Sequence, residues 1–163
     1  MFYVTIKAPS LKRESKMESV RLLYVSKIAT VDSGLKQNLI NILDEAIDFN
    51  YRNGVTGVLY YGHGYFVQCL EGNKNIIDDL FYNRIVKDER HINCEILYYA
   101  ENQTCLFSQW TMKFSPINKK ISEFFMQYHL EAFNPYLLTD ETTEKFISIL
   151  ACEPEYHVNE FVA

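Results

Sequence analysis

A polar amide interrupts a short apolar segment of the sequence. Gln68 lies in the middle of residues 64–72, GYFVQCLEG, with Phe66 and Leu70 on its own face of the predicted strand. A primary amide among apolar side chains is costly unless its two donors and its acceptor find partners. We therefore expect Gln68 to take part in a buried hydrogen-bond network.

Tyr24 can supply a partner for this amide. It lies midway along a second apolar run, residues 20–26, two residues after Leu22 and on the same face. If the two strands are neighbours, its hydroxyl meets the Gln68 amide, which keeps spare hydrogen-bonding capacity. A flat polar molecule between the helices could use that capacity. The alternative is a Tyr–Gln pair that satisfies itself in the core and binds nothing.

Three further residues have both a functional and a structural interpretation. Asn50 lies near the C-terminal end of a predicted helix, on or near its inward side, where Asn is also common as a helix-end residue. Trp110 and Met112 share one face of the last predicted strand. Both could simply be core side chains, because Met often fills gaps in a core.

Other kinds of chemistry find little support in the sequence. No GxGxxG, GxxxxGK[ST] or GxSxG motif is present, which argues against the corresponding nucleotide-binding and serine-hydrolase sites. The four histidines are far apart and the four cysteines show no CxxC or CxxH spacing, so no metal site is predicted. The adjacent carboxylates Asp44-Glu45 and Asp78-Asp79 point in different directions on predicted helices, and we expect them to be solvated.

Composition narrows the possible classes of protein. The chain has 163 residues, 48% of them hydrophobic and 23% charged, which suits one globular domain. A formal net charge of −5 disfavours direct contact with nucleic acid. Neither a signal peptide nor an apolar run long enough for a membrane span is found, and the cysteines are expected to be reduced thiols, so we predict a cytoplasmic protein.

The pattern of the first 115 residues predicts a βαββαβ order with one added strand. Asp32 or Ser33 is expected to cap the first helix and Gly54 to end it, and residues 62–64, GHG, predict a hairpin. This order is typical of an α+β, ferredoxin-like βαββαββ sheet with both helices on one face and the first and third strands as central neighbours. Strands are expected at 20–26, 56–61, 65–71, 94–100 and 110–114, and helices at 35–53 and 76–88.

The second face of the sheet also needs cover, because the strands do not alternate cleanly between apolar and polar residues. Apolar spacing predicts a helix over 121–133, a break at Asn134-Pro135 and a last helix that begins at Thr139 or Asp140. We expect this C-terminal helical hairpin to pack on the face opposite the first two helices.

Several short segments, in this order and spacing, resemble the BLUF family of flavin-binding blue-light sensors, and specifically its short members without an enzymatic output domain. They are LYVS at 23–26, Asn50 followed by VTGVLYY at 55–61, FVQCLEG at 66–72, DERH at 88–91 with Asn93, and WTM at 110–112. The expected organisation is an N-terminal tail at 1–18, a BLUF domain at 19–115, the helical hairpin at 116–152, which looks like the extension of short members, and a C-terminal tail at 153–163.

The resemblance implies a mechanism for the Tyr–Gln pair. BLUF proteins bind FAD non-covalently, with the flavin ring between the two helices of a ferredoxin-like fold. By resemblance, Tyr24 is the photochemical electron and proton donor, and Gln68 is the switching amide between Tyr24 and the flavin. Blue light then moves an electron and a proton from Tyr24, and Gln68 rotates or tautomerises before they return. The stronger hydrogen bond to the flavin shifts its absorption to the red.

The resemblance also assigns roles to other residues. Asn50 would bind the edge of the flavin, and Arg90 and His91 match positions near its ribityl–phosphate side. Trp110 and Met112 would pass the change onward, to the last strand and the hairpin above it.

The implied function is a photoreceptor that signals by light-dependent contact with another, unidentified protein, and not by enzymatic turnover. The aromatic residues of the C-terminal helices leave self-association open. Two alternatives also stay open: a flavin-free regulatory module of the same fold, and a small flavin-dependent oxidoreductase. One departure is Phe49, which stands where many family members have a histidine or another polar residue. We expect it to alter the packing of the flavin or the recovery rate without preventing binding.

Overall fold

Most of the chain is described by a computed structural model, which covers residues 18–29, 34–101, 103–108, 110–114, 119–128 and 133–152. Apart from Glu18, the expected tails at 1–18 and 153–163 lie outside these residues, as do Asp32 and Ser33. Within the described ranges, no helix has the length and apolar character needed to cross a membrane.

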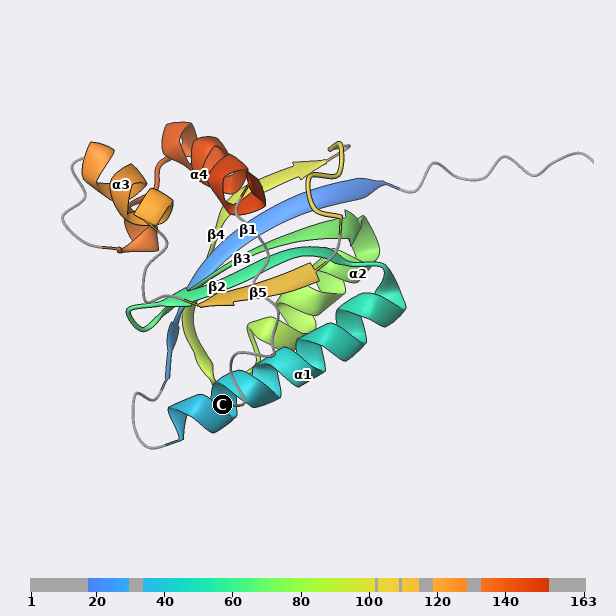
Figure 1. The fold of residues 1–163 in the computed structure, drawn as a ribbon. Coiled ribbons are helices and arrows are strands. Elements are labelled where there is room, and N and C mark those ends of the chain that lie inside the picture. The colour runs from blue at the N-terminus through green and yellow to red at the C-terminus, as the bar shows by residue number, and fades with distance from the viewer. Residues whose placement is uncertain are drawn as a thin grey trace, which may run out of the picture.

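A five-stranded sheet forms the centre of the fold (Figure 1). Its strands lie in the order β4-β1-β3-β2-β5, and all neighbouring pairs are antiparallel except β2 and β5. The first and third strands are therefore central neighbours, and the predicted ferredoxin-like α+β fold is confirmed. The bounds are Ser19–Ile28 for β1, Thr56–Gly62 for β2, Tyr65–Asn73 for β3, His91–Glu101 for β4 and Trp110–Phe114 for β5.

Helix α1 (Leu35–Asn53) crosses one face of the sheet beside α2 (Lys74–Asp79), below the strands in Figure 1. It ends at Gly54, as predicted. Its start differs from the prediction, because the N-cap is Gly34, which has no side chain that could accept a hydrogen bond from the first turn.

The second predicted helix is not one continuous α-helix. After α2 the chain continues as a π-helical segment, η1 (Leu80–Ile85). The Val86 N–H donates to the carbonyl of Phe81, five residues earlier, at 3.0 Å. A widened turn of this kind is common at functional sites. The apolar spacing of the sequence could not show it, because an extra residue in one turn shifts the phase of the pattern without removing it.

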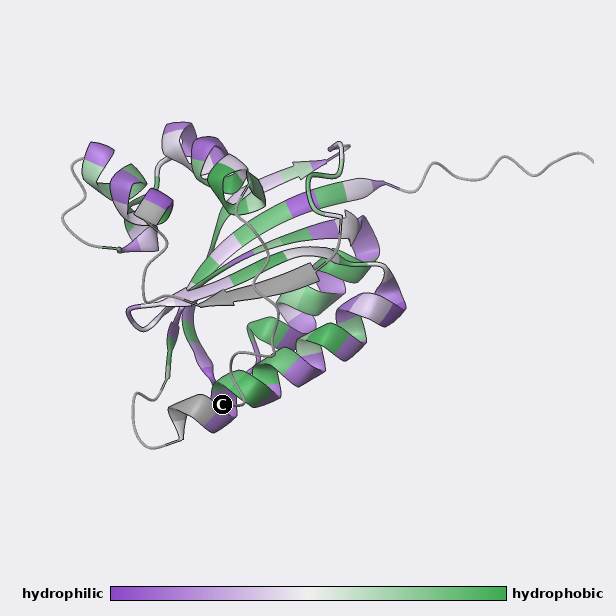
Figure 2. Ribbon diagram, in the orientation of Figure 1, coloured by the Kyte–Doolittle hydropathy of each residue, from purple (hydrophilic) through white to green (hydrophobic). Residues whose placement is uncertain are grey.

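Helices α3 (Lys119–Gln127) and α4 (Asp140–Cys152), with the short 3₁₀ segment η2 (Pro135–Leu137), cover the opposite face of the sheet. The predicted placement of the C-terminal helices is thus confirmed, although α3 ends at Gln127, before the expected boundary. Figure 2 shows hydrophobic residues along the strands and hydrophilic residues on the outward turns of α3 and α4.

The two faces of β1 bury different side chains, which explains the missing apolar–polar alternation. Leu22 and Tyr24 belong to the cluster beneath α1 and α2. Leu23 and Val25 belong to the cluster that α3 and α4 cover, together with Phe146. Each face of the sheet has its own hydrophobic core. Both faces of a central strand are therefore buried, and polar residues are unfavourable on either face.

A buried ion pair fixes the loop before β5. Arg21 Nε lies 2.6 Å from Glu71 Oε1, and both side chains are more than nine-tenths buried. The same Glu71 carboxylate accepts hydrogen bonds from the backbone N–H groups of Leu106 and Phe107, at 2.9 and 3.1 Å. A charged pair in a core is tolerated when further hydrogen bonds satisfy it. Here those bonds tie residues 103–108 to the ends of β1 and β3.

Gly57 is the position where the sheet tolerates a side chain least. Its φ is 141°, and an added Cβ would lie 2.0 Å from the Cys69 carbonyl oxygen. We expect Gly57→Ala to lower the free energy of unfolding by more than about 2 kcal/mol, because the clash is with backbone rather than with a flexible side chain. Urea unfolding followed by circular dichroism measures this.

Gly64 in the hairpin provides the matched control. Its φ of 82° also disfavours other residues, but no atom lies within 4 Å of an added Cβ. Gly64→Ala should cost only about 1 kcal/mol. Equal losses for both variants would contradict the close-approach explanation.

Candidate functional site

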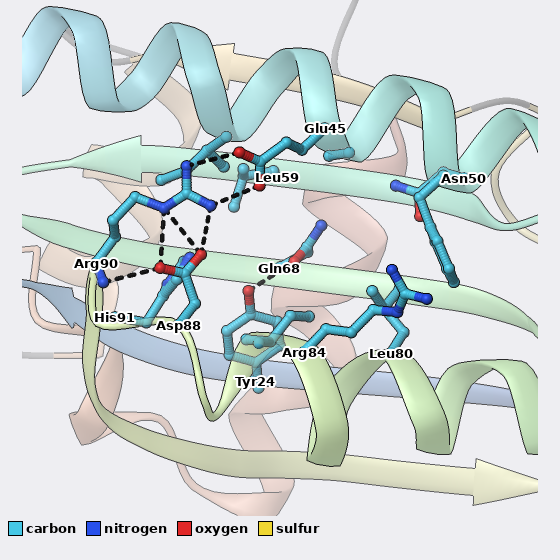
Figure 3. Close-up of a pocket in the computed structure, with 14 residues that line it drawn as sticks. Tyr24, Glu45, Asn50, Leu59, Gln68, Leu80, Arg84, Asp88, Arg90 and His91 are labelled. Carbon is cyan, nitrogen blue, oxygen red and sulfur yellow. Dashed lines mark hydrogen bonds and ion pairs between the residues drawn. The ribbon is translucent and has the colours of Figure 1, made fainter.

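A cleft opens between α1, η1 and the sheet, on the face that lies away from the C-terminal helices (Figure 3). Its volume is about 700 Å³, part of which is open to solvent. Its described lining includes residues that the sequence singled out: Tyr24, Asn50, Gln68, Arg90 and His91. They come from β1, α1, β3, the turn before β4, and β4 itself, so the fold gathers them from four separate elements and a turn.

Tyr24 and Gln68 form a buried hydrogen bond at the base of the cleft. The strand register places them directly opposite each other on β1 and β3. The Tyr24 hydroxyl donates to Gln68 Oε1 at 2.6 Å, and the two residues are 1% and 4% exposed. Burial raises the pKa of Tyr24 well above its ordinary value, so the hydroxyl keeps its proton. Because Oε1 accepts this proton, the amide N–H groups of Gln68 remain available to other partners.

Asn50 holds an unsatisfied acceptor in the same cleft. Its side chain is 1% exposed, and its Oδ1 has no hydrogen-bond partner among the described residues. The backbone carbonyl of Asn50 accepts from the Val55 N–H at 2.9 Å, which fixes the helix end against the start of β2. An unpaired buried oxygen costs about 1–3 kcal/mol. An oxygen held in this way is suited to accept a hydrogen bond from a bound molecule.

Arg90 is tied to both sides of the cleft. Its guanidinium lies 2.6 Å from a carboxylate oxygen of Asp88 and 2.6 Å from one of Glu45 on α1 (Figure 3). Burial acts to raise the pKa of Asp88, but the hydrogen bonds from Arg90 outweigh it and hold that pKa below its usual value. The cluster therefore joins one guanidinium to carboxyl groups from two sides of the cleft.

His91 lies deeper in the cleft and carries no charge at neutral pH. It is 8% exposed, and its Nδ1 lies 2.9 Å from the Ser26 hydroxyl oxygen. Burial lowers the pKa of His91 to about 4. Its ring centroid lies 4.7 Å from that of Phe66, which lies two residues before Gln68 on β3.

Trp110 and Met112 lie on β5. The register pairs Met112 with Leu59 on β2, and Leu59 with Gln68 on β3. Met112 therefore occupies the same cross-strand row as the Tyr24–Gln68 pair, two strands away from Gln68. Trp110 pairs with Gly57, one row further along this face.

Sequence analysis missed two contributors to the cleft. Glu45 is largely exposed, as expected for a solvated carboxylate, but it also forms the ion pair with Arg90. Arg84 lines the cleft from η1. Its spacing of four from Leu80 would have indicated a shared helix face, but a charged residue there looked like ordinary helix surface.

Comparisons with known proteins decide the family. The sequence model of BLUF, described as sensors of blue light using FAD, matches residues 20–113. This chain belongs to the BLUF family. Solved structures of BlsA in its ground and photo-activated states are 38% and 37% identical, with TM-scores of 0.79 and 0.78. These matches cover 86% of this chain and 93% and 99% of the BlsA chains.

Enzymes also contain similar segments. Photoactivated adenylate cyclase subunit beta of Euglena longa is 30% identical over 122 residues, which are 72% of this chain but 14% of that protein. A bacterial light-regulated adenylyl cyclase is 32% identical with a TM-score of 0.56, and the match covers 35% of its chain. The present chain thus corresponds to the BLUF part of such proteins and spans only 14% of the length of that cyclase subunit.

The residues of the cleft fit a flavin. An isoalloxazine ring presents a carbonyl–NH edge, which needs both donors and acceptors. Gln68 Nε2 offers donors and Asn50 Oδ1 offers the free acceptor, while Leu59, Leu80 and Ile85 supply apolar walls. Polar groups that converge in a mostly apolar pocket are typical of cofactor sites.

Asn50→Leu tests this fit from both directions. The flavin-free variant should be about 1–2 kcal/mol more stable than the flavin-free wild type, because an unpaired buried oxygen is removed. It should also bind flavin at least about tenfold more weakly, because a hydrogen bond to the ring is lost. Thermal unfolding without flavin and titration with flavin measure the two effects.

Asn41→Leu makes the same change at an exposed position of α1. It should leave flavin affinity unchanged. If Asn50→Leu bound flavin as tightly as the wild type, Asn50 would have no role in holding the ring.

Proposed function

We propose that this chain is a photoreceptor that binds FAD non-covalently and uses the Tyr24–Gln68 hydrogen bond as its light-operated switch. The observation that carries the proposal is that bond itself: 2.6 Å long, buried, and placed at the wall of a cleft that fits a flavin. Bound flavin supplies blue-light absorption and an electron-accepting excited state. The remaining steps are carried by the chain's own side chains.

Tyr24 is suited to give up an electron and a proton together. Its raised pKa shows that the surroundings disfavour a bare phenolate, so loss of the proton alone is unfavourable. The Gln68 Oε1 lies in line to receive the hydroxyl proton. Loss of both particles together leaves the Tyr24 side chain neutral, whereas loss of either alone would leave it charged in a low-dielectric environment.

The Gln68 amide can then exchange the positions of its oxygen and its N–H groups. In the present arrangement Oε1 faces Tyr24, and no described residue accepts a hydrogen bond from the amide N–H groups. Rotation or tautomerisation of the amide changes which group it presents to the cleft. Because the site is closed to water at this point, the exchanged arrangement persists until the hydrogen bonds rearrange again in the dark.

FAD is the proposed form of the flavin, on the basis of the family description. The cleft is partly open to solvent, so the adenosine part can extend beyond it. Arg90 and His91 lie at the cleft, consistent with their proposed place on the ribityl side.

We further infer that the signal passes to the C-terminal helices and from there to a partner protein. Val67 and Cys69, the neighbours of Gln68 on β3, belong to the cluster that α3 and α4 cover. Any shift of the β3 backbone therefore moves side chains both at the cleft and beneath the C-terminal helices. Trp110 and Met112 are the proposed relay on β5, and Met112 shares the cross-strand row of Gln68.

A second connection leads from the cleft to the hairpin. The Tyr136 hydroxyl of η2 donates to the Asn93 carbonyl at 2.6 Å, and Asn93 lies two residues after His91. Asn93 has a φ of 54°, next to an irregularity in the β1–β4 pairing. A local change at His91 therefore reaches η2 over a short path.

Tyr24→Phe and Gln68→Ala test the switch. Both variants should bind flavin, because neither change closes the cleft, and both should lose the reversible red shift under blue light. Absorption spectra in the dark and after illumination measure it. Tyr99→Phe removes a hydroxyl outside the cleft, where it contacts Lys74, and should keep the full shift.

Three spectral outcomes separate the proposal from its alternatives. A normal shift in either switch variant would contradict the roles of Tyr24 and Gln68. A colourless protein that takes up no flavin would indicate a flavin-free module. Bleaching by reduced nicotinamide, with reoxidation by a substrate, would indicate an oxidoreductase.

Hydrogen exchange measures the output. We expect the amides of η2 and the first turn of α4 to exchange faster in the light, and Tyr136→Phe to reduce this difference while keeping the red shift. Tyr128→Phe, elsewhere in the hairpin, is the control. If Met112→Ala abolished the difference and Tyr136→Phe did not, the relay would run through β5 alone.

A further inference from the structure

Residues 103–108 form a strap that follows β4 and leads towards β5, and a buried ion pair holds it. The Glu71 carboxylate at the end of β3 accepts hydrogen bonds from the backbone N–H groups of Leu106 and Phe107, at 2.9 and 3.1 Å. The Arg21 guanidinium on β1 pairs with this carboxylate at 2.6 Å. The strap is therefore anchored to both central strands of the sheet.

Stability alone does not account for this ion pair. Arg21 and Glu71 are 6% and 4% exposed, and hydrophobic residues of similar volume usually stabilise a core as well as a buried ion pair does. Charged groups add directional hydrogen bonds: Arg21 Nη2 donates to the Thr104 carbonyl at 2.6 Å, while Glu71 accepts from the strap backbone. Such charge-assisted bonds are short and strong. The pair is thus suited to set where the strap lies.

The strap has empty space on one of its sides. A cavity of about 420 Å³, partly open to solvent, lies against the strap at Gln103 and Cys105. Glu71 lines the same cavity, as do Gly54 and Thr56 at the start of the second strand. Close packing on every side would resist movement of the strap. With empty space beside it, the position of the strap is decided by the residues that anchor it.

The anchor lies on the strand that carries the proposed switch. Glu71 follows Gln68 by three residues on β3, and its partner in the strand register of β1 is Arg21. A displacement of β3 at Gln68 therefore moves the Glu71 carboxylate and the strap amides that are bonded to it. Phe107 of the strap belongs to the same buried cluster as Phe146 of α4. The movement thus reaches the C-terminal helices as well as β5.

We propose that Arg21 and Glu71 are positioning residues of the light response: the Glu71 carboxylate transmits a movement of β3 to the strap, and the strap moves β5 from its N-terminal end. The inference rests on the proposed switch at Tyr24 and Gln68. It gives the signal a path along β3 and through the strap, in addition to the cross-strand row that contains Met112.

Hydrogen exchange of the β5 amides, residues 110–114, tests the proposal on the flavin-loaded protein in the dark and in the light. In the wild type these amides should exchange faster in the light. Glu71→Asp keeps the charge beside Arg21 but withdraws the carboxylate from the strap. The double variant Arg21→Gln, Glu71→Gln removes both charges, so that neither is left buried alone. Both variants should keep the full red shift, while the light-minus-dark difference at β5 should fall at least about fivefold.

Glu101→Gln is the matched control, since Glu101 is exposed at the end of β4 and ion-pairs with Lys74 at 3.1 Å. It should leave both the red shift and the exchange difference unchanged. Arg21→Lys should keep most of the difference, because the Glu71 carboxylate stays paired and still holds the strap.

A purely structural role for the pair predicts a different result. Exchange at β5 would then rise equally in the dark and in the light, and an unchanged difference in the Glu71→Asp and double variants would overturn the proposal. Loss of the red shift in these variants would overturn it as well, because the pair would then act on the flavin site. If the wild type itself gave no red shift, the proposed function would fail.

Discussion

The structure depends most on one buried hydrogen bond, from the Tyr24 hydroxyl to Gln68 Oε1. In water a tyrosine and an amide exchange partners freely, so their arrangement would carry no information. Here both side chains are buried, and Tyr24 packs in one cluster with Leu70 and Phe81. A donor or acceptor left unpaired in such a place costs about 1–3 kcal/mol. The orientation of the amide is therefore decided by the few groups it can reach. This is the condition that a hydrogen-bond switch requires.

The central strand β3 connects the Tyr24–Gln68 hydrogen bond to other parts of the fold. Gln68 faces the cleft, while Val67 and Cys69 face the C-terminal helices. At the end of the same strand, Glu71 pairs with Arg21 and holds the loop that leads into β5. One strand thus contacts the cofactor cleft, the hairpin and the start of the last strand. A fold with a solvated second face could not couple the three in this way.

Sequence reasoning reached the fold and the Tyr24–Gln68 hydrogen bond because both can be predicted from the residue pattern of individual strands. The apolar runs on both faces of β1 and β3 required two layers of helices, and Gln68 stood out because an amide among Phe66 and Leu70 needs a partner. The remaining features depend on distances between separate elements. The pairing of Glu45 with Arg90 and the stacking of Arg84 on Phe49 join residues from different segments. The widened turn of η1 is local, but it shifts the apolar spacing without removing it. The cap of α1 was predicted wrongly for a local reason: Gly34 takes that position, although Asp32 and Ser33 were the stronger candidates by residue type.

Energy limits the kind of response that this switch can produce. Exchanging one hydrogen bond is worth about 1–3 kcal/mol, which shifts an equilibrium by about 5- to 150-fold. The hairpin buries Phe124, Phe125, Phe146 and Leu150 against the sheet, and each such side chain contributes about 1.5–3 kcal/mol through burial. Releasing the whole hairpin would therefore cost several times what the switch supplies. A rearrangement confined to η2, where the Tyr136 hydroxyl forms a single hydrogen bond to the Asn93 carbonyl, is within reach. In the proposed function, a partner protein should accordingly recognise a shifted surface at this end of the hairpin, not a newly exposed core.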